Sequence, residues 1–206
     1  IALAALGYTT TVVLLLVPHL APAFIVGLGL CFLLVLFLLL RSGTSRPAEA
    51  FASHLSTVLY IALPMAAAVF LVMQGTMILI GFMCLLWTND TGAYLVGKPL
   101  GKHKLMPLVS PGKSWEGLIG GVVLTMGVAW FIGTHHHELS LKAWLIAGFA
   151  ISISATVGDL FESAMKRAAG VKDSGSIMPG HGGVLDRFDG YLFAAPVMVV
   201  IALMMR

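Results

Sequence analysis

Cations, carboxylates and glycines are concentrated in residues 163–189, which read SAMKRAAGVKDSGSIMPGHGGVLDRFD. This mixture is typical of a site for phosphate and a metal ion, because basic side chains neutralise phosphate oxygens and carboxylates hold hard divalent cations. Glycines also let backbone N–H groups approach an anion. The simpler alternative is that the basic residues only anchor a helix end and that the glycines only form a turn. The presence of all three kinds of residue together favours the phosphate–metal interpretation.

Four carboxylates form two pairs with the same spacing, Asp159 with Glu162 and Asp186 with Asp189. Residues three apart share one face of a helix. If one loop joins the two helices, Asp159 and Asp186 lie at neighbouring helix ends. We therefore expect them to share a Mg²⁺ ion, which proteins usually hold with one or two carboxylates and substrate phosphates. Simple ion pairs, such as Glu162 with Lys166 or Asp186 with Arg187, are the alternative interpretation.

A second polar group spans residues 97–117, GKPLGKHKLMPLVSPGKSWEG. Its Gly-Lys-Ser triplet resembles the end of a P-loop, but the glycine that a P-loop needs five residues earlier is Pro107 here. We predict instead that Ser110 caps a helix with Pro111 at its first position. The N-terminus of that helix, together with Lys113, would favour a phosphate. A capped helix with a basic flank and no ligand is the alternative.

The composition indicates which elements must position these residues. Hydrophobic residues make up 59% of the 206 residues and charged residues only 10%, against about a quarter in soluble domains. The mean hydropathy is +0.98. These values exclude a soluble globule and a disordered chain. The two cysteines, Cys31 and Cys84, lie in apolar runs and build neither a disulfide framework nor a zinc site. The remaining class is a helical membrane protein that crosses the bilayer several times.

We predict an all-α transmembrane bundle of about seven segments. They lie near residues 2–17, 22–40, 55–73, 76–94, 115–132, 141–158 and 184–205. Residues 1–75 would form N-terminal membrane helices, and residues 76–206 a catalytic region with loops at 98–114 and 161–187. Asp90 falls inside the fourth segment. A charge at a helix centre costs about 2.5–3.5 kcal/mol on the insertion scale and usually marks a functional site.

The basic residues give the orientation. Ten of the twelve Lys and Arg residues follow the second, fourth or sixth segment, and only Lys142 and Arg206 fall on the other side. The positive-inside rule places the ten in the cytoplasm. We therefore expect an integral protein of a bacterial-type inner or plasma membrane, with its active site facing the cytoplasm.

The stretch 163–189 resembles the signature of phosphatidate cytidylyltransferases, also called CDP-diacylglycerol synthases. The matching residues are Ser163, Lys166, Arg167, Lys172, Asp173, Pro179, His181, Gly182, Gly183, Asp186, Arg187 and Asp189. The similarity continues upstream in residues 89–94, 101–105, 110–117 and 158–163, so that it covers roughly the last 120 residues. The first 80 or so match only in being apolar. Members of the family usually have more N-terminal membrane helices, so the resemblance suggests a chain that lacks an N-terminal part.

The resemblance implies that CTP and phosphatidate react to give CDP-diacylglycerol and pyrophosphate. It also implies an integral membrane enzyme that depends on Mg²⁺, with a monovalent cation such as K⁺ beside it, and it associates Asp159 and Asp186 with the metals. The residues that we expect to be catalytic are Asp159, Asp186, Lys166, Arg167, Lys172, His181 and Arg187. Those that we expect to bind substrate are Ser110, Lys113, Ser163, Asp173, Gly182, Gly183 and Asp189.

The basic residues would neutralise phosphate oxygens, since both reactants are anionic. The phosphatidate phosphate is already a nucleophile near neutral pH, so no strong general base is required. His181 would donate to a phosphate or position its loop. We expect CTP and phosphatidate as partners and no nucleic acid, and a homodimer is an open alternative to a monomer.

Three other functions compete with this one. A CDP-alcohol phosphotransferase motif begins Asp-x-x-Asp-Gly, as residues 186–190 do, but the Ala-Arg pair that should follow is absent. A cytidylyltransferase or kinase acting on another lipid is a second alternative. A transporter is the third, but it predicts polar groups near the bilayer midplane and on both sides, whereas here they gather on one side.

Overall fold

The computed structural model describes residues 37, 41, 47–175, 183 and 185–205. The chain divides into two compact units, residues 1–73 and 74–206. In the first unit, α3 (Pro47–Thr57) continues through a short π-helical turn (Val58–Ala62) into α4 (Leu63–Gln74).

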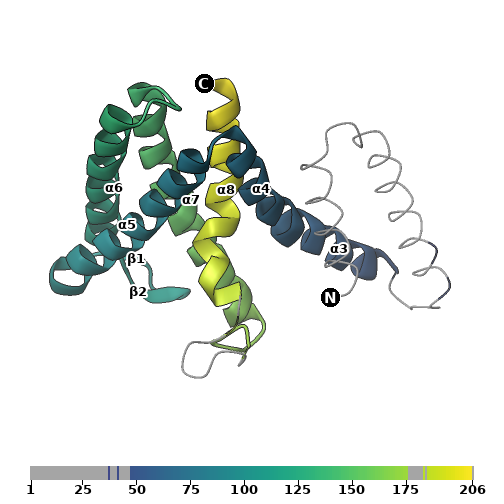
Figure 1. Cartoon of the computed structure of the whole chain (residues 1–206). Coiled ribbons are helices and arrows are strands. Elements are labelled where there is room, and N and C mark those ends of the chain that lie inside the picture. The colour runs from purple at the N-terminus through teal and green to yellow at the C-terminus, as the bar shows by residue number, and fades with distance from the viewer. Residues whose placement is uncertain (1–36, 38–40, 42–46, 176–182, 184, 206) are drawn as a thin grey trace. The chain divides into compact units, whose positions relative to one another are not determined.

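The second unit contains four long helices and one small hairpin (Figure 1). The helices are α5 (Thr76–Leu100), α6 (Trp115–His135), α7 (Leu141–Ala168) and α8 (Leu185–Met204). The antiparallel strands β1 (Lys104–Met106) and β2 (Ser110–Ser114) lie between α5 and α6, and Lys104 pairs with Ser114. The described chain is thus mostly helical, as predicted, with one hairpin that the all-α prediction lacked.

Within the described residues, four helices are long and apolar enough to cross a membrane, and they match the last four predicted segments. The prediction of about seven is not confirmed. The first two segments lie outside the described residues, apart from Phe37. The third falls on the stretch from α3 to α4, where the apolar helix is shorter than a membrane span.

Two of the helices run more than one turn beyond their predicted ends. α5 continues past residue 94 to Leu100, and α7 continues past residue 158 to Ala168. Hydropathy marks where the apolar residues stop, whereas the helical hydrogen bonds continue into polar sequence. With 28 residues, α7 is about 42 Å long, which exceeds a hydrocarbon core of about 30 Å. Its polar last turns therefore reach the membrane surface.

The start of α6 differs from the prediction that Ser110 is its N-cap. Ser110 lies in β2 opposite Met106, and Ser114 caps the helix instead. The Ser114 hydroxyl oxygen accepts a hydrogen bond of 3.1 Å from the backbone N–H of Gly117. Residues 104–114 form a hairpin, so α6 begins only after Ser114, the last residue of that hairpin.

Small residues bring the helices close together. A Cβ atom on Gly117 of α6 would lie 3.1 Å from Gly97 Cα of α5. A Cβ atom on Gly158 of α7 would lie 2.6 Å from the Asp189 carbonyl oxygen of α8. Close approach through small residues is characteristic of membrane helices, which gain no hydrophobic energy by associating in lipid. At Gly158 this approach also sets the separation between Asp159 and the start of α8.

We expect Gly158→Ala to destabilise the protein by about 1–3 kcal/mol, because the added methyl group forces α7 and α8 apart. The matched control is Gly127→Ala in α6, where a Cβ atom meets nothing within 4 Å. Thermal unfolding in detergent should show a lower midpoint for the first variant and an unchanged or raised midpoint for the second. Equal midpoints would contradict the close packing at residue 158.

Candidate active site

The first part of the site is an ion pair between β2 and α7. Lys113 Nζ lies 2.5 Å from Asp159 Oδ2, and the two side chains are 24% and 36% exposed. The ammonium group also donates to the Thr156 carbonyl oxygen at 3.5 Å. Ser163, one turn further along α7, donates its hydroxyl to Asp159 Oδ1 at 3.3 Å. The hairpin is therefore what brings Lys113 to α7.

Two further carboxylates belong to the same cluster. Asp90 of α5 interacts electrostatically with both Asp159 and Lys113. Asp189 of α8 interacts with Asp159, Lys113 and Asp90. Three carboxylates thus lie within electrostatic range of one ammonium group, and when all three are ionised their combined charge exceeds that of Lys113. We name Asp90, Lys113, Asp159 and Asp189 the acidic cluster.

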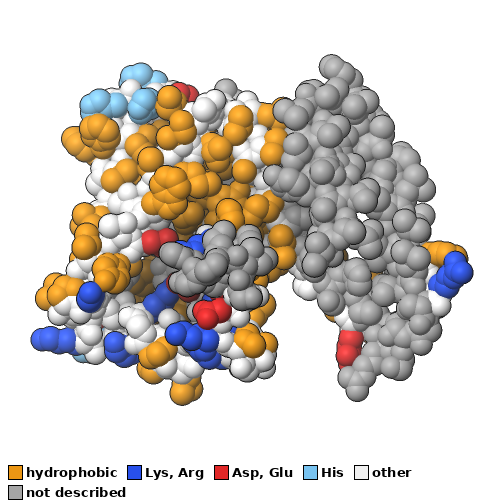
Figure 2. All heavy atoms as spheres, turned by 60° about the horizontal axis from the view of Figure 1, so that its bottom comes forward, with side chains coloured by type: hydrophobic (Ala, Val, Ile, Leu, Met, Phe, Trp, Pro, Cys, Tyr) orange, Lys and Arg blue, Asp and Glu red, His pale blue; other side chains and the backbone are white. Residues whose placement is uncertain are grey.

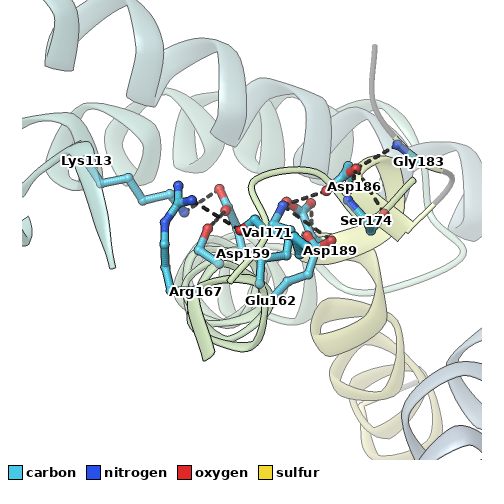
Figure 3. A network of polar contacts seen from close by, with 12 residues as sticks. Lys113, Asp159, Glu162, Arg167, Val171, Ser174, Gly183, Asp186 and Asp189 are labelled. Atoms are coloured by element: carbon cyan, nitrogen blue, oxygen red, sulfur yellow. Dashed lines mark hydrogen bonds and ion pairs between the residues drawn. The ribbon is translucent and has the colours of Figure 1, made fainter. Parts of the chain in front are cut away.

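The second part of the site is centred on Asp186, in the first turn of α8 (Figure 3). Lys166 Nζ donates to Asp186 Oδ1 at 2.6 Å. The other oxygen accepts from the backbone N–H and the hydroxyl of Ser174, both at 2.9 Å, and from the N–H of Gly183 at 2.7 Å. Asp186 therefore joins the end of α7, the loop that follows it and the start of α8.

Glu162 links these two parts. Its side chain is completely buried, and its Oε1 lies 3.5 Å from Lys166 Nζ. It also interacts electrostatically with Asp186 and Asp189. The predicted alternative pairing of Glu162 with Lys166 is thus present. Its central position was missed from the sequence, where the signals were its spacing of three residues from Asp159 and of four residues from Lys166.

The other predicted site residues lie around these two parts. Arg167 is exposed and donates Nη1 to the Val171 carbonyl oxygen at 3.3 Å. Lys172 and Asp173 are exposed in the loop after α7, and Arg187 is exposed in the first turn of α8. His181 and Gly182 lie outside the described residues.

The site lies near one end of the helices. Asp159 is about 27 Å along α7 from its first residue, close to the edge of a hydrocarbon core of about 30 Å. Asp186 and Asp189 lie in the first turns of α8, whose start follows α7 through the same loop. Figure 2 shows Lys and Arg side chains gathered toward this end of the unit, and a group of His side chains at the other. A charged site at this depth can bind a lipid headgroup and a water-soluble anion at the same time.

The donor set fits a magnesium ion that substrate phosphates help to hold. Among the described residues, no three His, Cys, Asp or Glu side chains are placed to bind one metal ion by themselves. Asp159 and Asp186 each contact one lysine, and the acidic cluster carries excess negative charge. Carboxylate oxygens beside a phosphate-binding surface are the ligands that Mg²⁺ prefers, with water and phosphate completing its shell.

Four membrane-length helices with an acidic and basic site at one end define an integral membrane protein. The model of the cytidylyltransferase family matches residues 1–205, so the chain belongs to this family. The family resemblance inferred from residues 163–189 is therefore confirmed.

Curated relatives carry a more specific name. The chain is 43% identical over 123 residues to a phosphatidate cytidylyltransferase of Staphylococcus aureus (strain COL), a match that covers 57% of this chain and 45% of the relative. It is 45% identical over 121 residues to the phosphatidate cytidylyltransferase of Staphylococcus haemolyticus, covering 58% and 46%. The chain thus spans about half the length of the curated relatives it matches.

Proposed function

We propose that this protein transfers a cytidylyl group from CTP to phosphatidate, giving CDP-diacylglycerol and pyrophosphate in phospholipid biosynthesis. The observation that carries the proposal is the acidic cluster, in which β2 and three helices bring Asp90, Lys113, Asp159 and Asp189 together beside Lys166 and Asp186. The relatives named phosphatidate cytidylyltransferase support the choice of substrates.

The main obstacle to this reaction is repulsion between the substrates. A phosphatidate oxygen attacks the α-phosphorus of CTP, the bond to the β-phosphate oxygen breaks, and pyrophosphate leaves. Two unit charges 4 Å apart repel by about 4 kcal/mol at an effective dielectric constant of 20. We infer that Lys166, Arg167, Lys172 and Arg187 lower this cost by neutralising phosphate oxygens. Catalysis would then consist mainly of alignment and charge stabilisation.

Asp159 and Asp186 are the residues that would hold Mg²⁺, which supplies further neutralisation of the triphosphate when bound. The ammonium groups of Lys113 and Lys166 lie against these two carboxylates. A phosphate bound there therefore meets positive charge from the chain itself. A monovalent cation such as K⁺ beside this site is part of the same proposal.

The decisive experiment is incorporation of labelled CTP into lipid by membranes that contain the protein. We expect incorporation that requires phosphatidate and releases pyrophosphate. Incorporation that depends on another lipid would contradict the proposed acceptor, and consumption of CDP-diacylglycerol without CTP would indicate a phosphotransferase.

We further propose that the site faces the cytoplasm of a bacterial-type inner membrane, on the basis of the positive-inside rule. In a cysteine-free background, Lys102→Cys should react with a membrane-impermeant maleimide in inverted vesicles but not in intact spheroplasts. Glu138→Cys, in the exposed loop between α6 and α7, should show the reverse pattern. Labelling of both positions from the same side would refute this orientation.

A further inference from the structure

The turn of the hairpin consists of four consecutive apolar residues, Met106-Pro107-Leu108-Val109. The Val109 N–H donates to the Met106 carbonyl oxygen at 3.2 Å, and Pro107 occupies the second position, which it favours in such turns. Leu108 is 95% exposed and Met106 is 49% exposed. Exposed turns normally carry Gly, Asn, Asp or Ser, so an apolar tip of this kind marks a contact surface.

The base of the hairpin is fixed to the helices. The Trp115 N–H donates to the His103 carbonyl oxygen at 2.9 Å, and His103 Nδ1 lies 2.6 Å from Glu116 Oε1. Gly101 has no room for a side chain, because a Cβ atom there would collide with the Gly97 carbonyl oxygen and the Ser114 hydroxyl. The tip is therefore held at a defined place relative to α5 and α6.

The base of the hairpin also lies at the level of the membrane interface. Tyr94 and Trp115 are 61% and 53% exposed on α5 and α6, near the helix ends that the hairpin joins. Lys98 donates to the Tyr94 hydroxyl oxygen at 2.8 Å. Exposed Trp and Tyr residues are characteristic of the boundary between lipid tails and headgroups.

The segment carries only positive charge. Residues 98–114 contain four lysines and no Asp or Glu. Lys113 is paired with Asp159, whereas Lys98, Lys102 and Lys104 are exposed. A basic segment with an apolar tip is complementary to a bilayer surface that contains anionic lipids.

We propose that the hairpin, residues 101–114, docks on the anionic surface of the membrane that α5–α8 cross. Leu108 and Met106 enter the boundary between headgroups and acyl chains, and Lys102 and Lys104 contact lipid phosphates. This inference is independent of the proposed reaction, since it depends only on the spanning helices and the exposed hairpin.

The test attaches an environment-sensitive fluorophore to Leu108→Cys in a cysteine-free background. The protein is placed in nanodiscs of phosphatidylcholine alone or of phosphatidylcholine with phosphatidylglycerol, with brominated acyl chains as quencher. We expect strong quenching in the anionic discs and weaker quenching in the neutral ones. A label at Ala169→Cys is the control, because the end of α7 extends roughly 10 Å beyond the hydrocarbon core and should not be quenched.

The double variant Lys102→Glu/Lys104→Glu tests the charged part of the proposal. One lysine near an anionic surface favours the docked state about fivefold, so removing both positive charges should lower the docking equilibrium constant in anionic discs roughly 25-fold, and the two new carboxylates should lower it further. Three outcomes would overturn the proposal: absence of quenching at residue 108, equal quenching in both kinds of disc, and protection from aqueous iodide without quenching by brominated lipid. The last result would mean that protein covers the tip.

Discussion

Asp159→Asn and Asp186→Asn are each expected to lower the rate of CDP-diacylglycerol synthesis by about 100- to 1000-fold or more. That range is the usual loss when a preorganised electrostatic group is removed from a catalytic site. Both side chains lie at adjoining ends of α7 and α8 and contact lysines that we assign to phosphate binding. The measurement is incorporation of labelled CTP at matched amounts of membrane-inserted protein. Glu138→Gln, which alters an exposed acid at the other end of the bundle, should retain full activity.

The two variants differ in which other contacts they disrupt besides the proposed metal ligand. Asp186 also accepts hydrogen bonds from Ser174 and Gly183, so its amide substitute loosens the loop after α7. Among the described residues, Asp159 contacts the side chains of Lys113 and Ser163, so its substitution tests the metal-binding role more directly. Binding of Mn²⁺ as a stand-in, followed by electron paramagnetic resonance, should weaken in Asp159→Asn. Unchanged Mn²⁺ binding together with near-normal turnover in both variants would show that neither carboxylate holds the metal.

The placement of Asp159 toward the end of α7 and of Asp186 at the start of α8 could be predicted from the sequence, because membrane topology places the end of one span beside the start of the next. That the two carboxylates share a metal ion stays a prediction. The pairing of Glu162 with Lys166 was likewise accessible, since four-residue spacing on a helix brings the side chains together. The ion pair between Asp186 and Lys166 was not, because the two residues are twenty apart in the sequence and meet across the loop. Local spacing does not report which side chains a turn brings together.

The contribution of the hairpin was beyond sequence reasoning. The short, lysine-rich stretch before α6 carries no clear alternation of apolar residues, and Ser110-Pro111 is typical of a helix start. The structure instead uses Ser114 as the cap and thereby places Lys113 on Asp159. Asp90 was recognised as unusual because a charge inside a span is costly, but its partners depend on how α5 packs against α7 and α8. Such contacts between distant segments follow from tertiary packing alone.

Lys113→Met is expected to reduce both stability and activity, because Lys113 is the cation that pairs with Asp159 in the acidic cluster. Its loss leaves Asp159 facing Asp90 and Asp189 without compensation. The ion pair is partly exposed, so the cost should be about 1–3 kcal/mol, between the values for surface and buried pairs. The measurement is thermal unfolding in detergent without added divalent cation.

A double-mutant cycle distinguishes the structural role of Lys113 from its chemical role. Adding Asp159→Asn to Lys113→Met removes one of the repelling carboxylates, so stability should recover toward that of the parent protein. Activity should not recover, since the double variant lacks both a phosphate-facing ammonium group and a proposed metal ligand. Recovery of stability would thus show that Lys113 compensates the negative charge of the carboxylates. Continued inactivity would show that charge compensation alone does not restore catalysis. Additive losses of stability would instead mean that the two residues do not interact, which would contradict the contact between β2 and α7 that organises the site.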